Sequence, residues 1–212
     1  MKSLAILGAS GHGRVVADMA SLIGWDDIVF FDDKYPRLTT SGPWPVVGNT
    51  AALLESHGAY AGVVVAIGIC RVRLEKHRQL REAGAALVSI VHPAASVSPR
   101  AMVRIGGVLM PGAVVNIGAA LGEACIVNSG ATVDHDCVIG DGVHIAPGAH
   151  VSGTVVIGEG SWIGVGATVR NDIAIGADVI VGAGAVVVKL VRDGLTVVGS
   201  PARPYKSAVG LD

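Results

Sequence analysis

Residues 128–151 read NSGATV DHDCVI GDGVHI APGAHV, four groups of six that each end in an aliphatic side chain. The same spacing extends in both directions, and every sixth residue from Val91 to Val187 is Val, Ile or Leu. An α-helix repeats about every 3.6 residues and a strand about every 2, so a strict period of six belongs to neither. A short repeat that continues over many copies predicts a solenoid.

The other positions of the six-residue unit describe its shape. Two places before the aliphatic residue stands a small or compact one almost throughout, as at Ala113, Cys125 and Cys137. The residue directly after the aliphatic one is often Gly, Asn or Asp, which tolerate the positive φ that a bend can need. We therefore expect each unit to be a short extended segment with inward aliphatic and small side chains. Three units would close one coil of a narrow prism, which gives about five to six coils of parallel strands.

Composition and charge disfavour several classes of protein. The formal net charge of −1 argues against nonspecific nucleic-acid binding. No apolar run of about 18 residues lacks charges or glycine breaks, so no membrane span is expected. The N-terminus leads directly into a strand, without a leader-like segment. The three cysteines, Cys70, Cys125 and Cys137, form no disulfide framework, and we expect a cytoplasmic protein.

The first half of the chain alternates short apolar runs with helical stretches. We expect strands at residues 4–7, 28–31, 46–47, 62–67 and 86–91, and helices at about 14–23, 51–56 and 71–82. Asn49 is a candidate N-cap for the second helix. This alternation predicts a small parallel, Rossmann-like α/β sheet. We set the domains at residues 1–91, which would bind a nucleotide, and 92–212, which would form the solenoid.

The first expected strand ends in the glycine-rich turn Gly8-Ala-Ser-Gly-His-Gly13. Backbone N–H groups at a helix N-terminus can approach a diphosphate, and Asp32 follows at about the spacing of a ribose-binding acid. The glycines are spaced G-x-x-G-x-G, however, and the domain has too few strands for two mononucleotide halves, which disfavours a redox dinucleotide. A nucleotide-bearing ligand and a tight turn without a ligand remain as interpretations.

Two histidines lie in the solenoid near acidic residues. His135 is flanked by Asp134 and Asp136, and both His135 and His144 are expected to point outward near the corners of the prism. A carboxylate can hold an imidazole in one tautomer and raise its basicity, so His135 is a candidate general base. Cys137 has an inward position in the repeat, which argues against a role as nucleophile.

Five segments carry a family resemblance: the turn at 8–13, DHDCVIGDxxHIxPG at 134–148, VxIGExxxIGxGA at 155–167, GAGAVVxK at 182–189 and GSPAR at 199–203. Together they resemble the trimeric hexapeptide-repeat nucleotide-sugar N-acetyltransferases. The resemblance implies a left-handed β-helix, a homotrimer, acetyl-CoA as cosubstrate and no metal. The acceptor would be a nucleotide-linked 4-amino-4,6-dideoxyhexose, linked to UDP as in the bacillosamine pathway or to GDP as in N-acetylperosamine synthesis.

The resemblance also implies roles for individual residues. His135 would be the general base for the sugar amine, and Asp136 the acid that raises its basicity. His144 would lie at the acetyl-CoA thioester, where the N–H of Gly153 would hold the carbonyl oxygen. The pantetheine arm would contact Val165 and Ala183, the second of which is Gly in relatives. The nucleotide sugar would be bound by Ser10, Gly11, His12, Asp32, Asp33 and Gly68. The amine would attack the thioester directly, without an acyl-enzyme.

Three alternatives remain open from the sequence. Sialic acid O-acetyltransferases have the same architecture. A carbonic-anhydrase-like metalloenzyme would use His135, His144 and His150 as zinc ligands, but would leave the first domain without a role. A non-catalytic solenoid would not explain the clustered histidines. The nucleotide base is also open, because Asp32 and Asp33 could accept N–H groups from uracil or from guanine.

Overall fold

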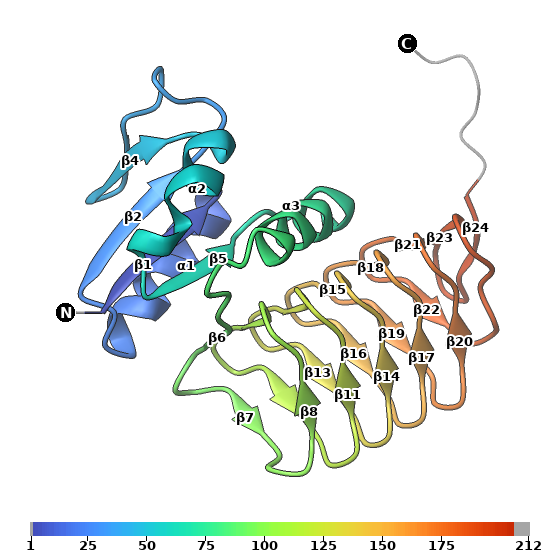
Figure 1. The fold of residues 1–212 in the computed structure, drawn as a ribbon. Coiled ribbons are helices and arrows are strands. Elements are labelled where there is room, and N and C mark those ends of the chain that lie inside the picture. Colours follow the sequence, from blue (N-terminus) through green and yellow to red (C-terminus); the bar gives the residue numbers. More distant parts are fainter. Residues whose placement is uncertain (1, 206–212) are drawn as a thin grey trace, which may run out of the picture.

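The computed structural model describes residues 2–205, which form an α/β domain followed by a prism of stacked coils (Figure 1). The domain has one sheet, with strand order β3-β4-β2-β1-β5. The strands are β1 (Ser3–Leu7), β2 (Asp27–Phe31), β3 (Thr40–Ser41), β4 (Trp44–Gly48) and β5 (Gly62–Val65). All pairs are parallel except β3 with β4. The predicted parallel α/β sheet is thus confirmed.

Three α-helices and one short 3-10 helix flank this sheet. They are α1 (Gly11–Leu22), α2 (Thr50–Ser56), η1 (His57–Ala59) and α3 (Cys70–Glu82). α1 begins at Gly11 instead of near Arg14, so the glycine-rich turn leads directly into its first turn. The side chain of Asn49 accepts the N–H of Ala52 at 3.0 Å and caps α2, as predicted.

The prism consists of very short strands arranged on three faces. The first face has β7 (Ser96–Val97), β10 (Val114–Val115), β13 (Thr132–Val133), β16 (His150–Val151), β19 (Thr168–Val169) and β22 (Val186–Val187). The second face has β8 (Met102–Val103), β11 (Ala120–Leu121), β14 (Val138–Ile139), β17 (Val156–Ile157) and β20 (Ala174–Ile175). The third face has β6 (Ile90–Val91), β9 (Val108–Leu109), β12 (Ile126–Val127), β15 (His144–Ile145), β18 (Trp162–Ile163), β21 (Ile180–Val181), β23 (Thr196–Val198) and β24 (Arg203–Pro204).

The pairing register confirms three six-residue units per coil. Val133 pairs with Val151 in the next coil, and the strands between successive coils are parallel. From Leu109 to Val187 every sixth residue is buried, whereas Val91, where the chain enters the prism, is 37% exposed. A continuous aliphatic core therefore holds the coils together.

The glycines that follow the aliphatic residues have a different role from the one expected. Positive φ occurs three residues after the aliphatic position, as at Gly112 (φ 71°), and not directly after it. A Cβ at Gly140 would stand 2.6 Å from the nitrogen of Glu159, and one at Gly158 would stand 2.4 Å from that of Ala177. The expectation of positive φ directly after the aliphatic residue was therefore wrong. At these glycines it is the close approach of the next coil that leaves no room for a side chain.

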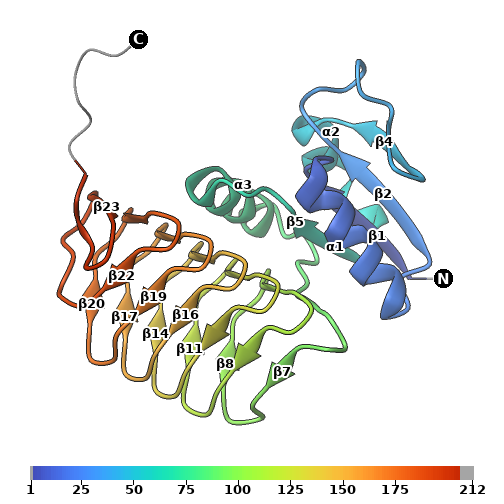
Figure 2. The same ribbon diagram turned by 180° about the vertical axis from the view of Figure 1, so that it is seen from behind.

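The two parts of the chain meet along the third face. The stretch expected as one strand at 86–91 is divided: Leu87 bridges to Val63, whereas β6 pairs with β9 of the prism. The outward side chains of Ile90, Val108 and Ile126 are fully buried against the α/β domain. α3 extends from this junction along the prism, as both views show (Figures 1 and 2). No helix within residues 2–205 has the length and apolar character of a membrane span.

Candidate active site

The prism has three corners, and each is identified by a residue or helix that lies at it. The His135 corner joins the first and second faces, the α3 corner joins the second and third, and the Val165 corner joins the third and first. Each corner is a stack of turns, one per coil. The position of a residue in the repeat therefore fixes the corner at which it lies.

The glycine-rich turn between β1 and α1 is built by close backbone packing. Gly8 has a φ of 110°, and a Cβ at Gly13 would stand 2.0 Å from the carbonyl oxygen of Gly8. The carboxylate of Asp32 closes the turn, because it accepts the N–H groups of Ala9 at 2.9 Å and Lys34 at 3.0 Å. Asp32 thus orders the loops at this edge of the sheet, which its spacing alone did not reveal.

A pocket of about 460 Å³ opens at the carboxyl ends of β1, β2 and β5, where ligands bind in open α/β sheets. Its lining includes the predicted Ser10, Asp32, Asp33 and Gly68, together with Leu7, Gly8, Lys34, Thr50, Ile67, Ile69 and Trp162. Ser10 precedes α1 without a side-chain cap, so the N–H groups of the first turn remain available to an anion. The predicted Gly11 and His12 form that first turn.

Asp33 supplies a second carboxylate to this pocket. It accepts the backbone N–H of Thr50 at 2.9 Å. This hydrogen bond, opposed by partial burial, holds the pKa of Asp33 below its ordinary value. The pocket therefore combines the ionised carboxylate of Asp33 with the uncapped N-terminus of α1, which suits a ligand with both N–H donors and phosphates.

His144 and His12 approach each other across the junction of the two domains. Their ring centroids are 6.4 Å apart, and the ring of His144 also stacks on Trp162 at 5.0 Å. Burial, assisted by the positive charge of Arg73, lowers the pKa of His144 to about 3 and that of His12 to about 4. His144 points outward from the prism as predicted, but it lies in β15 on the third face, whereas a position near a corner was expected. The α/β domain covers it, and both rings are neutral near pH 7.

His135 forms a hydrogen-bonded pair with Asp136 at the His135 corner. Its Nδ1 lies 2.9 Å from a carboxylate oxygen of Asp136, and its side chain is 53% exposed. An ionised carboxylate only accepts, so Nδ1 carries the proton and Nε2 has a free lone pair. The same hydrogen bond raises the pKa of His135 above its ordinary value. Asp134 orients the residue further by accepting its backbone N–H at 2.8 Å.

Two glycines make room for this pair. A Cβ at Gly153 would stand 2.5 Å from Cε1 and Nε2 of His135, and one at Gly118 would stand 2.3 Å from a carboxylate oxygen of Asp136. The N–H of Gly153 has no hydrogen-bond partner within residues 2–205. Gly153, whose backbone N–H is free, therefore packs against the ring that carries the basic nitrogen. A base and a backbone donor near one reacting carbon are what acyl transfer requires.

The residues expected to contact acetyl-CoA do not all meet within one chain. Val165 and Ala183 are both exposed and occupy successive coils at the Val165 corner. His135 and Gly153 lie at the His135 corner, on the opposite edge of the first face. His144 lies on the third face under the α/β domain. A single chain thus presents three separate parts of the predicted site.

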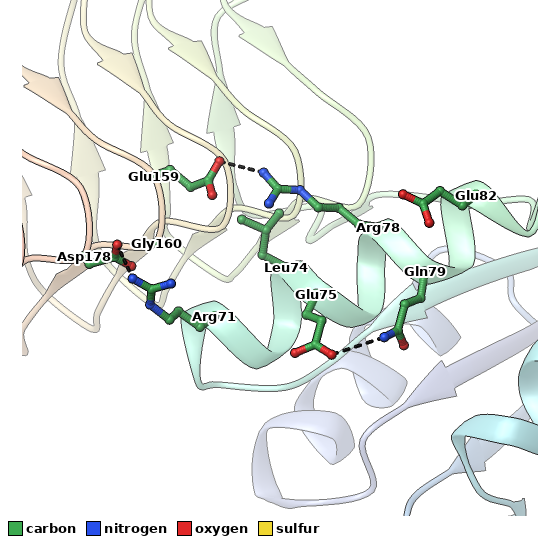
Figure 3. Close-up of a pocket in the computed structure, with 9 residues that line it drawn as sticks. All are labelled: Arg71, Leu74, Glu75, Arg78, Gln79, Glu82, Glu159, Gly160 and Asp178. Atoms are coloured by element: carbon green, nitrogen blue, oxygen red, sulfur yellow. Dashed lines mark hydrogen bonds and ion pairs between the residues drawn. The ribbon is translucent and has the colours of Figure 1, made fainter.

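α3 docks on the α3 corner through a row of ion pairs that the sequence did not predict. The pairs are Arg71 with Asp178, Arg78 with Glu159 at 2.6 Å, and Arg81 with Glu123 at 2.6 Å. The first two border a groove of about 390 Å³ (Figure 3). Since basic groups of the helix are paired with acids of the prism, we assign this groove to domain docking.

Sequence reasoning also missed Trp162 and Arg73. Trp162 occupies an outward position of the repeat, and no neighbouring residue in the sequence indicates a role for it. Only the fold places it in the pocket. A signal for Arg73 was present, because it shares the buried stripe of α3 with Cys70, Leu74 and His77. A charged residue on an apolar stripe is rarely buried unless it is paired.

Two alternatives find no geometric support in the described part of the chain. No three His, Cys, Asp or Glu side chains of residues 2–205 come together as metal ligands. Cys137 is fully buried and its Sγ lies 3.1 Å from the carbonyl oxygen of Ser152. Burial raises the pKa of the Cys137 thiol, which disfavours the nucleophilic thiolate.

Comparison with known proteins covers both parts of the chain. Residues 3–80 match the PglD N-terminal domain, and residues 118–153 and 154–189 match the bacterial transferase hexapeptide (six repeats). UDP-N-acetylbacillosamine N-acetyltransferase of Bacillus subtilis is 35% identical over 113 residues, and the match spans 52% of that relative's length and of this chain.

Two solved structures resemble the chain over nearly its whole length. The acetyltransferase domain of PglB from Neisseria gonorrhoeae, in complex with acetyl coenzyme A, is 43% identical with a TM-score of 0.91, covering 96% of this chain and 99% of that one. PerB from Caulobacter crescentus, in complex with CoA and GDP-perosamine, is 35% identical with a TM-score of 0.92, covering 97% and 98%. The chain therefore belongs to the acetyl-CoA-dependent hexapeptide-repeat sugar N-acetyltransferases, with their α/β domain and left-handed parallel β-helix.

Proposed function

We propose that the protein transfers the acetyl group of acetyl-CoA to the 4-amino group of a nucleotide-linked 4-amino-4,6-dideoxy sugar. The observation that carries this proposal is the pairing of His135 with Asp136 beside the free N–H of Gly153. These groups supply a base and an oxyanion donor at one place. The full-length resemblance to structures that hold acetyl-CoA, or CoA with GDP-perosamine, supports the same chemistry.

The proposed reaction uses the free lone pair of His135. An amine attacks a thioester only when it is unprotonated, so Nε2 would accept the amine proton as the C–N bond forms. The carbonyl oxygen would become an oxyanion bound by the N–H of Gly153, and the thiolate of CoA would leave when the intermediate collapses. The departing sulfur then takes up a proton. Asp136 would stabilise the imidazolium, as its hydrogen bond to Nδ1 already favours the protonated ring.

The pocket of the α/β domain is the proposed site for the nucleotide. Phosphates would lie at the uncapped N-terminus of α1, near Ser10 and Gly11. Asp33 has a carboxylate oxygen that makes no hydrogen bond within residues 2–205 and could accept from the base. Trp162 extends the pocket onto the prism, so a sugar attached to the diphosphate would be directed toward the β-helix.

We further propose a homotrimer, with each active site between two copies. The His135 and Val165 corners lie on opposite edges of the first face. A neighbouring copy is therefore needed to bring the proposed base next to the proposed pantetheine contacts. The outward side chains of the second face also form an apolar row, namely Met102, Ala120, Val138, Val156 and Ala174. Closed symmetry is the usual way to cover such a surface. Sedimentation at micromolar concentration should give three copies, and a monomer would contradict the shared site.

The cysteines bear on the compartment in which the reaction takes place. Cys70, Cys125 and Cys137 are all free and buried. Free thiols fit the reducing cytoplasm, where we propose that the enzyme acts.

Release of the CoA thiol provides the direct test of the function. Purified protein would be assayed with acetyl-CoA and a panel of UDP- and GDP-linked 4-amino sugars, each paired with its 4-hydroxy counterpart. We expect thiol release with at least one amino sugar and N-acetylation of the product by mass spectrometry. Release with the hydroxy sugars alone would favour an O-acetyltransferase. Whether the UDP-linked or the GDP-linked sugars react would identify the nucleotide that the pocket accepts.

The role of His135 is tested by His135→Asn, which keeps much of its shape but removes the base. If His135 takes the amine proton, kcat/KM should fall by roughly 10²–10⁴ with little change in acetyl-CoA binding. A rival mechanism has the amine arriving neutral and His135 only orienting it. A loss below about tenfold with an unchanged pH profile would favour that rival.

A further inference from the structure

Arg73 of α3 is fully buried at the junction of the two domains. Its guanidinium makes no ion pair within residues 2–205 and instead donates to backbone carbonyl oxygens. These are Ala124 at 2.8 Å, Ile67 at 2.8 Å, Gly68 at 2.9 Å, Gly142 at 2.6 Å and Val143 at 3.4 Å. A buried charge without a counterion is costly, and these dipoles must offset its loss of hydration.

The carbonyl groups belong to three segments that are distant in sequence. Ile67 and Gly68 lie in the loop between β5 and α3, which forms one wall of the pocket. Ala124 and Gly142 are turns of two successive coils at the α3 corner. The planar fork of the guanidinium reaches all three segments at once, which the compact ammonium of a lysine cannot do. Arg73 thus joins the pocket wall directly to the β-helix.

Docking of α3 alone does not account for this arrangement. The ion pairs Arg71–Asp178, Arg78–Glu159 and Arg81–Glu123 already attach the helix to the corner, at partly exposed positions with little desolvation cost. Leu74 adds apolar contact from the same helix. What Arg73 adds is a fixed position for the Ile67–Gly68 loop. Its charge also acts on His12 and His144, which lie on either side of the same junction.

We propose that Arg73 is a positioning residue for the nucleotide-linked acceptor, fixing the Ile67–Gly68 wall of the pocket against the β-helix. This inference rests on the proposed function, since it takes the pocket to be the acceptor site. The proposal predicts that Arg73 influences acceptor binding more than acetyl-CoA binding, although Arg73 contacts neither the sugar amine nor the thioester. The positive charge beside His12 and His144 is a separable second effect.

Two variants separate the geometry from the charge. Arg73→Lys keeps the charge but loses the fork, and Arg73→Met loses both. Arg78→Met, which removes an ion pair from the same helix, is the matched control. Circular dichroism and thermal unfolding would verify that each variant folds. If Arg73→Met does not fold, Arg73→Lys alone tests the positioning role.

For Arg73→Lys we expect the acceptor KM to rise about tenfold or more, as when one charged hydrogen bond to the loop is lost. The KM for acetyl-CoA should stay within about twofold and Arg78→Met should resemble the parent. Histidine NMR should show the pKa of His12 and His144 raised in Arg73→Met but not in Arg73→Lys. Equal changes in both KM values, or the same effect in Arg78→Met, would overturn the proposal.

A second measurement distinguishes failure of this inference from failure of the proposed function. Calorimetry with UDP and with GDP measures binding to the pocket without any acetyl transfer. Weaker nucleotide binding in Arg73→Lys than in Arg78→Met supports the positioning role even if the reaction is a different one. Unchanged nucleotide binding in an active enzyme refutes the role of Arg73 and leaves the proposed function intact.

Discussion

Gly153 lies directly against the imidazole of His135, so closely that a Cβ would stand 2.5 Å from its Cε1 and Nε2 atoms. Both residues lie at the same corner in successive coils, because their numbers differ by the length of one coil. The hydrogen bond from His135 to Asp136 prevents the ring from simply turning away. The proposed catalytic site thus depends on the absence of a side chain at Gly153 as much as on the imidazole of His135.

Gly153→Ala should therefore displace the imidazole while leaving the fold intact. A shift of this kind in a catalytic group can cost about 10²-fold, and we expect kcat/KM to fall by at least that factor. Gly58→Ala is the matched control, since a Cβ there would meet no atom within 4 Å. Steady-state kinetics of both variants provide the measurement, and full activity in Gly153→Ala would show that His135 need not occupy this position.

The pH dependence of the rate should report the hydrogen bond between His135 and Asp136. The pKa of His135 is raised, so the neutral, basic ring is gained, and kcat/KM rises, as pH increases through that raised pKa. In Asp136→Asn the pKa of His135 should fall, so the rise of kcat/KM should move to lower pH. Its plateau should also be lower because His135 is then a weaker base. Asp134→Asn removes an equal charge that does not contact the ring, so its shift should be smaller. Equal shifts would argue against the direct hydrogen bond.

Asp32→Ala should impair the acceptor far more than acetyl-CoA. Its carboxylate holds the N–H groups of Ala9 and Lys34, so its loss loosens two loops of the pocket in addition to removing an acidic group. We expect the acceptor KM to rise by about tenfold or more with little change in that of acetyl-CoA. Asp18→Ala, an exposed position on α1, is the control. Parallel effects on both substrates would place the nucleotide elsewhere.

Stability should decrease in mild acid because of His144, which is buried, and His12, which is half-buried. A histidine in the unfolded chain has a pKa of about 6.5, whereas the pKa values of His144 and His12 are about 3 and about 4 in the folded chain. Between about pH 6.5 and 4 the unfolded state binds protons that the folded state does not, so stability is greatest above this range and falls as pH decreases. The melting temperature should follow this trend.

His144→Phe tests the origin of the acid sensitivity. It keeps a ring to stack on Trp162 and removes one titrating group, so its melting temperature should depend less steeply on pH. His150→Gln, which replaces an exposed histidine on the first face, should keep the parent's slope. An unchanged slope in His144→Phe would assign the acid sensitivity to other groups.

The sequence determined the β-helix almost completely. Its repeat is local and periodic, so the inward positions, the length of a coil and the parallel pairing all follow from the spacing of residues such as Val133 and Val151. The alternation of strands and helices in the first domain and the Asn49 cap were predictable for the same reason. The residues next to His135 were visible as a pattern, because the pair with Asp136 is local in the chain.

Tertiary structure decided what depends on contacts between distant segments. The burial of His144, the contribution of Trp162 to the pocket and the carbonyl cage of Arg73 exist only because the α/β domain folds back on the third face. Desolvation at that junction then lowers the pKa of both His144 and His12. The reason why glycine directly follows some of the aliphatic residues was likewise hidden, since a periodic sequence shows where a side chain is absent but not which neighbouring coil excludes it.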